Sequence, residues 1–211
     1  MIKNSQKILV IAILLIIGVA FIYFSNTGNE NGYAENGSGD LSENKTETET
    51  IVLPVVDGLV EEEEYSNLVY DAATGISVGW TNNDESIYIA LKSPGKGWVS
   101  IGIDPDSAMR GANFIIGYYD EGVYISDEYG TSNFVHNMDK NLGGTDDVLE
   151  YAGSETDQTV IEFKIPLDSG DDYDKSLKSG NRYDCIIAYN NNADNFTTKH
   201  TRIGNIQITI E

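Results

Sequence analysis

The chain has 211 residues, with 34 acidic and 13 basic side chains, a formal charge of −21 and a single cysteine. This length fits one main domain with appendages. The negative charge argues against nucleic-acid binding, because phosphates need Lys and Arg to neutralise them, and it would repel anionic lipid headgroups. The lone Cys185 excludes a disulfide framework and the C-x-x-C-H motif of covalent haem attachment.

Residues 1–24 predict a membrane segment. Lys3 and Lys7 precede an apolar run over residues 8–24, and the segment contains no acid. A membrane span needs about 17–25 residues, and no small-x-small cleavage site ends the run. We expect one N-terminal transmembrane helix that holds the rest of the chain on the extracellular face of the membrane. A cleaved signal peptide and a secreted protein are the alternative.

Residues 25–50 predict a disordered polar linker, because they contain almost no large apolar side chain. Glycosylation acceptor patterns begin at Asn36, Asn44 and Asn195, and the sequence leaves their use open. Once residues 1–24 are set aside, with their two lysines and no acid, the remaining chain carries a formal charge of −23. Solubility explains this charge more simply than a dedicated cationic partner does.

Residues 51–211 predict an all-β domain, an antiparallel β-sandwich or barrel. Apolar residues alternate with polar ones in short segments separated by turn residues, a pattern typical of antiparallel sheets. We expect no amphipathic helix of ten or more residues, and only a short turn within residues 172–178. Residues 129–156 look like a long polar insertion. The expected strands are 51–56, 75–80, 86–91, 98–104, 112–119, 123–128, 159–165, 183–189 and 203–210.

Met109 and His200 are the strongest candidate ligand residues. Met109 lies between turn residues, where a thioether has little to pack against, and a ligand pocket at one end of the sandwich would supply a partner. His200 lies in a second polar turn, FTTKHTRIG. A thioether and an imidazole together can bind the two faces of a haem iron. The plain alternatives are a core methionine and an exposed turn histidine.

Other sites are less well supported. His136 and Met138 would point to the same side of an extended segment, so they form a fallback ligand pair that reaches opposite faces of a porphyrin poorly. Two histidines and one cysteine do not give a zinc spacing. The acidic runs 104–106, 146–147 and 168–174 could bind calcium, although none follows the EF-hand pattern. No G-x-S-x-G or other catalytic motif indicates an enzyme.

The domain resembles the DOMON family of extracellular, immunoglobulin-like β-sandwiches, which includes the cytochrome domain of cellobiose dehydrogenase. The resemblance rests on VDGLVEEEEYS, SIYIAL, GWVSIGIDPDSAMRGANFIIGYYD, VYISDEYG, TVIEFKIPLDSGD and the closing YDCIIAYN…KHTRIG. In haem-binding members, a methionine after the GW-x-x-x-G strand and a histidine near the C-terminal end ligate the iron. Met109 and His200 occupy those places. This chain departs from eukaryotic members in lacking paired cysteines and cytochrome b561-type membrane helices.

The resemblance implies an extracellular b-type cytochrome domain that holds one non-covalent haem b between Met109 and His200 and passes single electrons. The redox partner, a protein or a small-molecule donor or acceptor, is not identified. Lys199 keeps open a Met/Lys ligation known in related sandwiches. The alternative is a carbohydrate-binding or adhesion module of the same fold, without haem, in which case a glycan is the ligand. Expected pocket walls are Trp98, Phe114 and Phe196, with Ile116, Tyr118 and Phe134 as further candidates.

Overall fold

The computed structural model describes residues 52–211, which lie within the compact unit Thr48–Glu211. The predicted anchor and linker, residues 1–24 and 25–50, lie outside the described residues. Within residues 52–211, no helix has the length and apolar character needed to cross a membrane.

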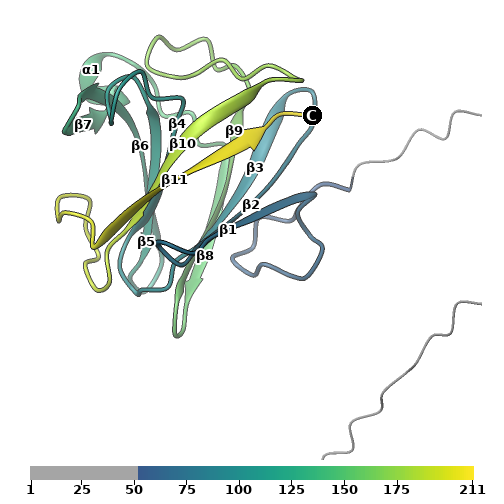
Figure 1. Ribbon diagram of the computed structural model, residues 1–211, viewed down its shortest axis with the longest axis vertical. Helices are drawn as coiled ribbons and strands as arrows, with labels where there is room; N and C mark the ends of the chain where they lie inside the picture. Colours follow the sequence, from purple (N-terminus) through teal and green to yellow (C-terminus); the bar gives the residue numbers. More distant parts are fainter. Residues whose placement is uncertain (1–51) are drawn as a thin grey trace, which may run out of the picture. The chain divides into compact units, whose positions relative to one another are not determined.

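Two antiparallel sheets form the domain (Figure 1). One sheet has the strand order β1-β2-β3-β9-β8, with bounds Asn67–Asp71, Ile76–Asn82, Ser86–Lys92, Thr159–Pro166 and Glu150–Glu155. The other has the order β11-β10-β4-β5-β6-β7, with bounds Arg202–Thr209, Arg182–Tyr189, Val99–Ile103, Asn113–Tyr119, Val123–Ser132 and Val135–Met138. The one short helix among the described residues, α1, spans Asp139–Leu142.

The core lies between the two sheets, as the alternating pattern predicts. Strand β3 buries Ile87, Ile89 and Leu91 completely, and its neighbour β9 places Phe163 beside Ile89. Val99, Ile101 and Ile103 of β4 belong to the same cluster. Each fully buried side chain of this kind contributes about 1.5–3 kcal/mol to the free energy of unfolding. The all-β sandwich is therefore confirmed.

A polar contact fixes the segment before β1 on the outer face of the five-stranded sheet. Glu162 of β9 is fully buried there and accepts hydrogen bonds from the Tyr65 hydroxyl at 2.7 Å and the Gly58 amide at 2.6 Å. Burial raises the pKa of Glu162. Leu53 and Val56 pack on the same face. The strand predicted over 51–56 is wrong for its described part, because residues 52–56 form no ladder, and only Leu53, Pro54 and Val56 are buried or half-buried.

The polar stretch 129–156 is more regular than the sequence indicates. It contains the end of β6, all of β7, helix α1 and all of β8. Strands β7 and β8 each lie at one edge of their sheet, and neither contains a fully buried residue. The prediction that residues 129–156 form one long polar loop is therefore wrong. The length of this stretch is divided among short elements that border the two sheets.

A candidate haem pocket on the outer face of one sheet

The outer face of the six-stranded sheet carries a second apolar cluster, separate from the core between the sheets. Strand β5 is apolar on both faces: Ile115 points into the core, while Phe114 and Ile116 point outward. Ile186 and Ala188 of β10 and Trp98 before β4 join this outward cluster. Gly102 makes room for it, because a Cβ there would lie 2.3 Å from the Phe114 ring. An outer sheet face of this kind needs a cover other than water.

A cavity of about 650 Å³ lies over this apolar cluster. Its volume falls within the range of about 300–1,000 Å³ that is usual for ligand pockets. Its floor contains Trp98, Phe114, Ile116, Ile186 and Ala188. Three connections form its walls, and they contribute Ala108 and Met109 between β4 and β5, Asn133 and Phe134 between β6 and β7, and residues 196–200 between β10 and β11.

The turn that carries Met109 is held by its own backbone and by β6. The Asp106 amide donates to the Arg110 carbonyl at 2.8 Å, and Ala108 adopts a positive φ of 48°. The Gly111 amide then donates to the Gly130 carbonyl at 2.8 Å. Gly130 is essential to this approach, since a Cβ on it would lie 1.7 Å from the Met109 carbonyl oxygen. Met109 is therefore half-buried against the outward cluster on a fixed turn.

The loop that carries His200 is tied to the cavity floor. The Trp98 indole N–H donates to the Thr198 carbonyl at 3.0 Å, and the Asn190 amide side chain donates to the Lys199 carbonyl at 2.7 Å. His200 is half-buried at the cavity wall. Burial, together with the positive charge of Lys199, lowers the pKa of His200. This shift favours the neutral imidazole, the form in which a ring nitrogen can bind a metal.

A second histidine, His136 of β7, lines the same cavity. Its Nδ1 pairs with the carboxylate of Glu128, which is itself buried and accepts a hydrogen bond from the Ser126 hydroxyl at 2.8 Å. The imidazole ring also lies against Phe114, with ring centroids 5.6 Å apart. A carboxylate partner of this kind fixes the orientation of a histidine ring.

The DOMON domain model matches residues 72–190, more than half of the chain. The chain belongs to the DOMON domain family. A human relative, DBH-like monooxygenase protein 1, is 31% identical over 101 residues, which cover 47% of this DOMON chain and 16% of the relative. The chain thus spans about one sixth of that protein's length.

Two solved structures are similar to this DOMON protein at TM-scores below 0.5. The cytochrome b domain of pyranose dehydrogenase from Coprinopsis cinerea has a TM-score of 0.45 and 13% identity, with 67% of this chain and 86% of that one covered. The cytochrome domain of cellobiose dehydrogenase from Myriococcum thermophilum has a TM-score of 0.40 and 11% identity, with 69% and 88% covered.

Most of the residues that the sequence singles out in this DOMON domain line one cavity. Met109 and His200 both do, although they are far apart in the chain. Met138 does not line it and is 42% exposed, so the structure does not bring His136 and Met138 together there as a ligand pair. Tyr118 does not line it either, but stacks on Tyr124 at 4.9 Å. The expected residues that do line the cavity are Met109, His200, Trp98, Phe114, Phe196, Ile116, Phe134, His136 and Lys199.

Sequence reasoning about the DOMON pocket missed several polar residues. Glu128 looks like one of many solvated acids, and only the register of β6 with β7 places it beside His136. The one available signal was the spacing of Glu128, two positions after Ser126 in a strand, which places both side chains on the same face of the sheet. The polar lining residues Ser100, Asn133 and Asn205 carry no local pattern that marks them.

Proposed function

We propose that this DOMON domain binds one haem b non-covalently in the cavity on its outer sheet face and carries single electrons. The observation that supports the proposal best is the placement of Met109 and His200 in the lining of one apolar cavity, on two separate turns. The resemblance to haem-binding members of the family implies iron ligands at these two positions. The non-covalent mode follows from the single cysteine, Cys185, which is buried in the core between the sheets.

The residues present fit a haem. Trp98, Phe114 and Phe196 offer apolar surface to a macrocycle, and the imidazole of His200 and the thioether of Met109 offer one ligand atom each. A haem iron bound by a methionine and a histidine supplies one-electron chemistry, and its potential is raised by the thioether. Because both axial positions would then be filled by the protein, the pocket offers no place for a substrate to bind iron.

Lys199 would have a supporting role, whereas His136 competes with His200 for the iron. Lys199 lines the cavity next to His200 and offers a positive charge to the carboxylates of a haem, in a domain where such charges are few. His136, oriented by Glu128, is the competing nitrogen ligand. We assign the iron to His200 because its loop is also held by Trp98, a residue of the pocket floor.

We further propose that the protein works as an electron carrier outside the membrane, anchored by residues 1–24. Its redox partner would be another protein or a small molecule that approaches the open side of the cavity. The monooxygenase named as a relative is matched over 16% of its length. The pocket described here offers ligands and apolar walls, so we propose no catalytic activity for this chain.

An absorbance titration tests the proposal. Haemin added to the purified full chain should give a sharp Soret band that saturates at one haem per protein, and pyridine haemochrome analysis should report haem b. Protein that stays colourless after haemin is added would overturn the proposal. In that case, binding of a glycan to the same cavity, detected by calorimetry, would favour the carbohydrate-binding alternative.

A further inference from the structure

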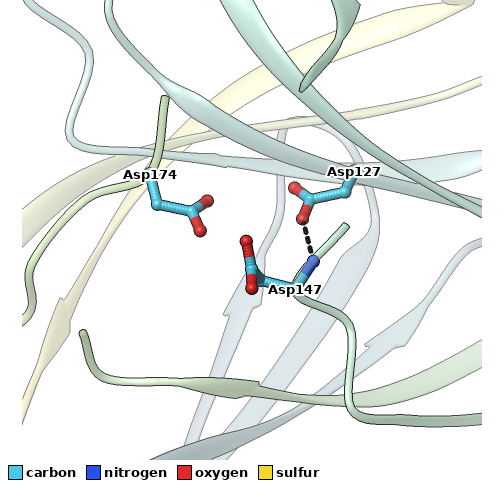
Figure 2. A group of neighbouring side chains, drawn as sticks. All are labelled: Asp127, Asp147 and Asp174. Atoms are coloured by element: carbon cyan, nitrogen blue, oxygen red, sulfur yellow. Dashed lines mark hydrogen bonds between the residues drawn. The ribbon is translucent and has the colours of Figure 1, made fainter. Parts of the chain in front are cut away.

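Three aspartates from separate segments of the chain meet in the fold, and none of them lines the candidate haem cavity. Asp127 comes from β6, Asp147 from the connection between α1 and β8, and Asp174 from the connection between β9 and β10. Each offers a carboxylate oxygen, and these oxygens lie within 4.8 Å of one another. Figure 2 shows the three carboxylates pointing toward a shared space, with the Asp147 amide donating to Asp127 at 2.8 Å.

Buried oxygen atoms without a hydrogen-bond partner occur in this group and in residues near it. Asp127 is 5% exposed, and its Oδ1 has no partner within residues 52–211, while its Oδ2 accepts the Asp147 amide. The side chain of Asn113 donates to Asp174 at 2.6 Å, which leaves the buried Asn113 Oδ1 unpaired. Both carboxylate oxygens of Asp139, which is 1% exposed, are also unpaired. Such atoms are costly unless a cation or another donor satisfies them.

No basic side chain of the described domain balances these acids. The ion pairs formed within residues 52–211 use other carboxylates, those of Asp104, Asp106, Glu128, Asp146 and Glu150. Burial, with the charges of the neighbouring aspartates, raises the pKa of Asp127 to about 7 and that of Asp139 to about 8. Burial likewise raises the pKa of Asp174 to about 6. The group therefore lacks the positive charge that buried carboxylates require.

We propose that Asp127, Asp147 and Asp174 bind one Ca²⁺ ion, with Asn113 Oδ1 as a further oxygen ligand. Oxygen atoms bound to one calcium at about 2.3–2.6 Å lie within about 5 Å of one another, so the observed grouping fits without a large movement. The absence of His and Cys from the group argues against zinc and copper. Ligands from three separate segments suit the irregular geometry of calcium better than the strict octahedron of magnesium.

The ion would link β6, the connection between α1 and β8 and the connection between β9 and β10, because one aspartate comes from each. Asp127 lies beside Glu128 on β6, and these two side chains point to opposite faces of the sheet. A cation on Asp127 would therefore fix the strand whose other face orients His136 at the haem cavity. The proposal does not depend on haem, since none of the three aspartates lines that cavity.

Calcium titration of the full chain tests the proposal. After removal of divalent ions with a chelator, calorimetry with CaCl₂ should show one site with a Kd of about 10⁻⁴ M or tighter, and the unfolding midpoint should rise. Asp127→Asn and Asp174→Asn should each weaken binding by tenfold or more. Asp172→Asn, which removes the same charge from an exposed neighbour of Asp174, should bind as the wild type does.

Three results would overturn the proposal. The first is that millimolar Ca²⁺ gives neither heat nor a shift of the unfolding midpoint. The second is that Asp172→Asn loses as much affinity as Asp174→Asn, which would indicate diffuse attraction by surface charge. The third is that Mg²⁺ binds as tightly as Ca²⁺, which would refute the calcium assignment. Metal-free Asp127→Asn should be at least as stable as the metal-free wild type, since it removes a repelling charge; marked loss of stability would indicate a purely structural aspartate.

Discussion

Replacement of Gly130 by alanine tests whether the Met109 turn positions an iron ligand. The new methyl group would lie 1.7 Å from the Met109 carbonyl oxygen, whereas ordinary van der Waals contact begins at 3.4 Å. The turn must therefore move outward by roughly 1.7 Å, which breaks or stretches the hydrogen bonds that Gly130 exchanges with Gly111 and Ala112. Overpacking of this size costs about 1–3 kcal/mol of unfolding free energy.

Haem binding should weaken in Gly130→Ala in addition to the loss of stability. A displaced thioether no longer reaches its place, and a loss of about 1.4 kcal/mol of binding free energy already weakens affinity tenfold. We expect a fall in haem affinity of about tenfold or more, with conversion from a low-spin to a partly high-spin spectrum. Urea unfolding gives the stability, and a haemin titration followed at the Soret band gives the affinity.

Gly122→Ala is the matched control for this experiment. Gly122 directly precedes β6, the strand that contains Gly130, and a Cβ added to Gly122 meets nothing within 4 Å. The control should keep both the stability and the haem affinity of the wild type. A Gly130→Ala protein that is destabilised but keeps the wild-type spectrum and affinity would refute the reasoning, because the Met109 turn would then have moved without effect on haem.

Three further predictions follow from named contacts. Met109→Ala should fold, change the spin state and lower the reduction potential; an unchanged spectrum in this variant with a lost spectrum in Met138→Ala would assign the ligand elsewhere. Trp98→Phe removes the hydrogen bond to Thr198 and should cost about 0.5–1.5 kcal/mol of stability and weaken haem binding. Trp80→Phe, which removes an equivalent hydrogen bond to Thr209 at 2.9 Å, should lose a similar amount of stability but keep its haem affinity. An equal loss of haem affinity in the two tryptophan variants would contradict the role of the His200 loop in binding haem. Burial raises the pKa of Glu162 above its ordinary 4.5, so its stabilising effect is complete below that value and is lost as the pH rises. As the pH rises, the unfolding free energy of Glu162→Gln should fall less steeply than that of the wild type, with a difference in slope of up to about 1.4 kcal/mol per pH unit. Equal slopes in the variant and the wild type would refute this prediction.

The strands of the core could be predicted because one simple rule determines them. Where a strand has one face on the core, apolar residues alternate, as Ile87, Ile89 and Leu91 do in β3. Strands β7 and β8 escaped prediction because an edge strand needs no such pattern; neither has a fully buried residue. Residues 52–56 misled the prediction, since an apolar stretch can also pack across a sheet without joining its ladder.

The cavity that we propose for haem could be predicted in part. A strand that is apolar on both faces, such as β5 with Ile115 inside and Phe114 outside, indicates a covered outer face, and Met109 in a polar turn indicates a ligand. The position of His136 could not be predicted, because it depends on the pairing of Gly130 with His136 and on a β-bulge in β6.

The aspartate group was still less accessible to sequence reasoning. Asp147 and Asp174 fall in acidic runs that the sequence does mark, whereas Asp127 lies within a strand. Only the folded chain shows that these three belong together. It also shows that Asp139 is buried, although the sequence does not distinguish it from the many other acids of the chain. Long-range proximity of this kind leaves no local trace in a sequence.

The most direct measurement of the central claim is the absorption spectrum of the haem-loaded full chain, recorded oxidised and after reduction with dithionite. A methionine and a histidine on the iron predict a low-spin b-type spectrum in both oxidation states. Met109→Ala and His200→Ala should each lose this low-spin spectrum. A high-spin spectrum in the wild type, or a low-spin spectrum that both variants retain, would contradict the assignment of the iron to Met109 and His200.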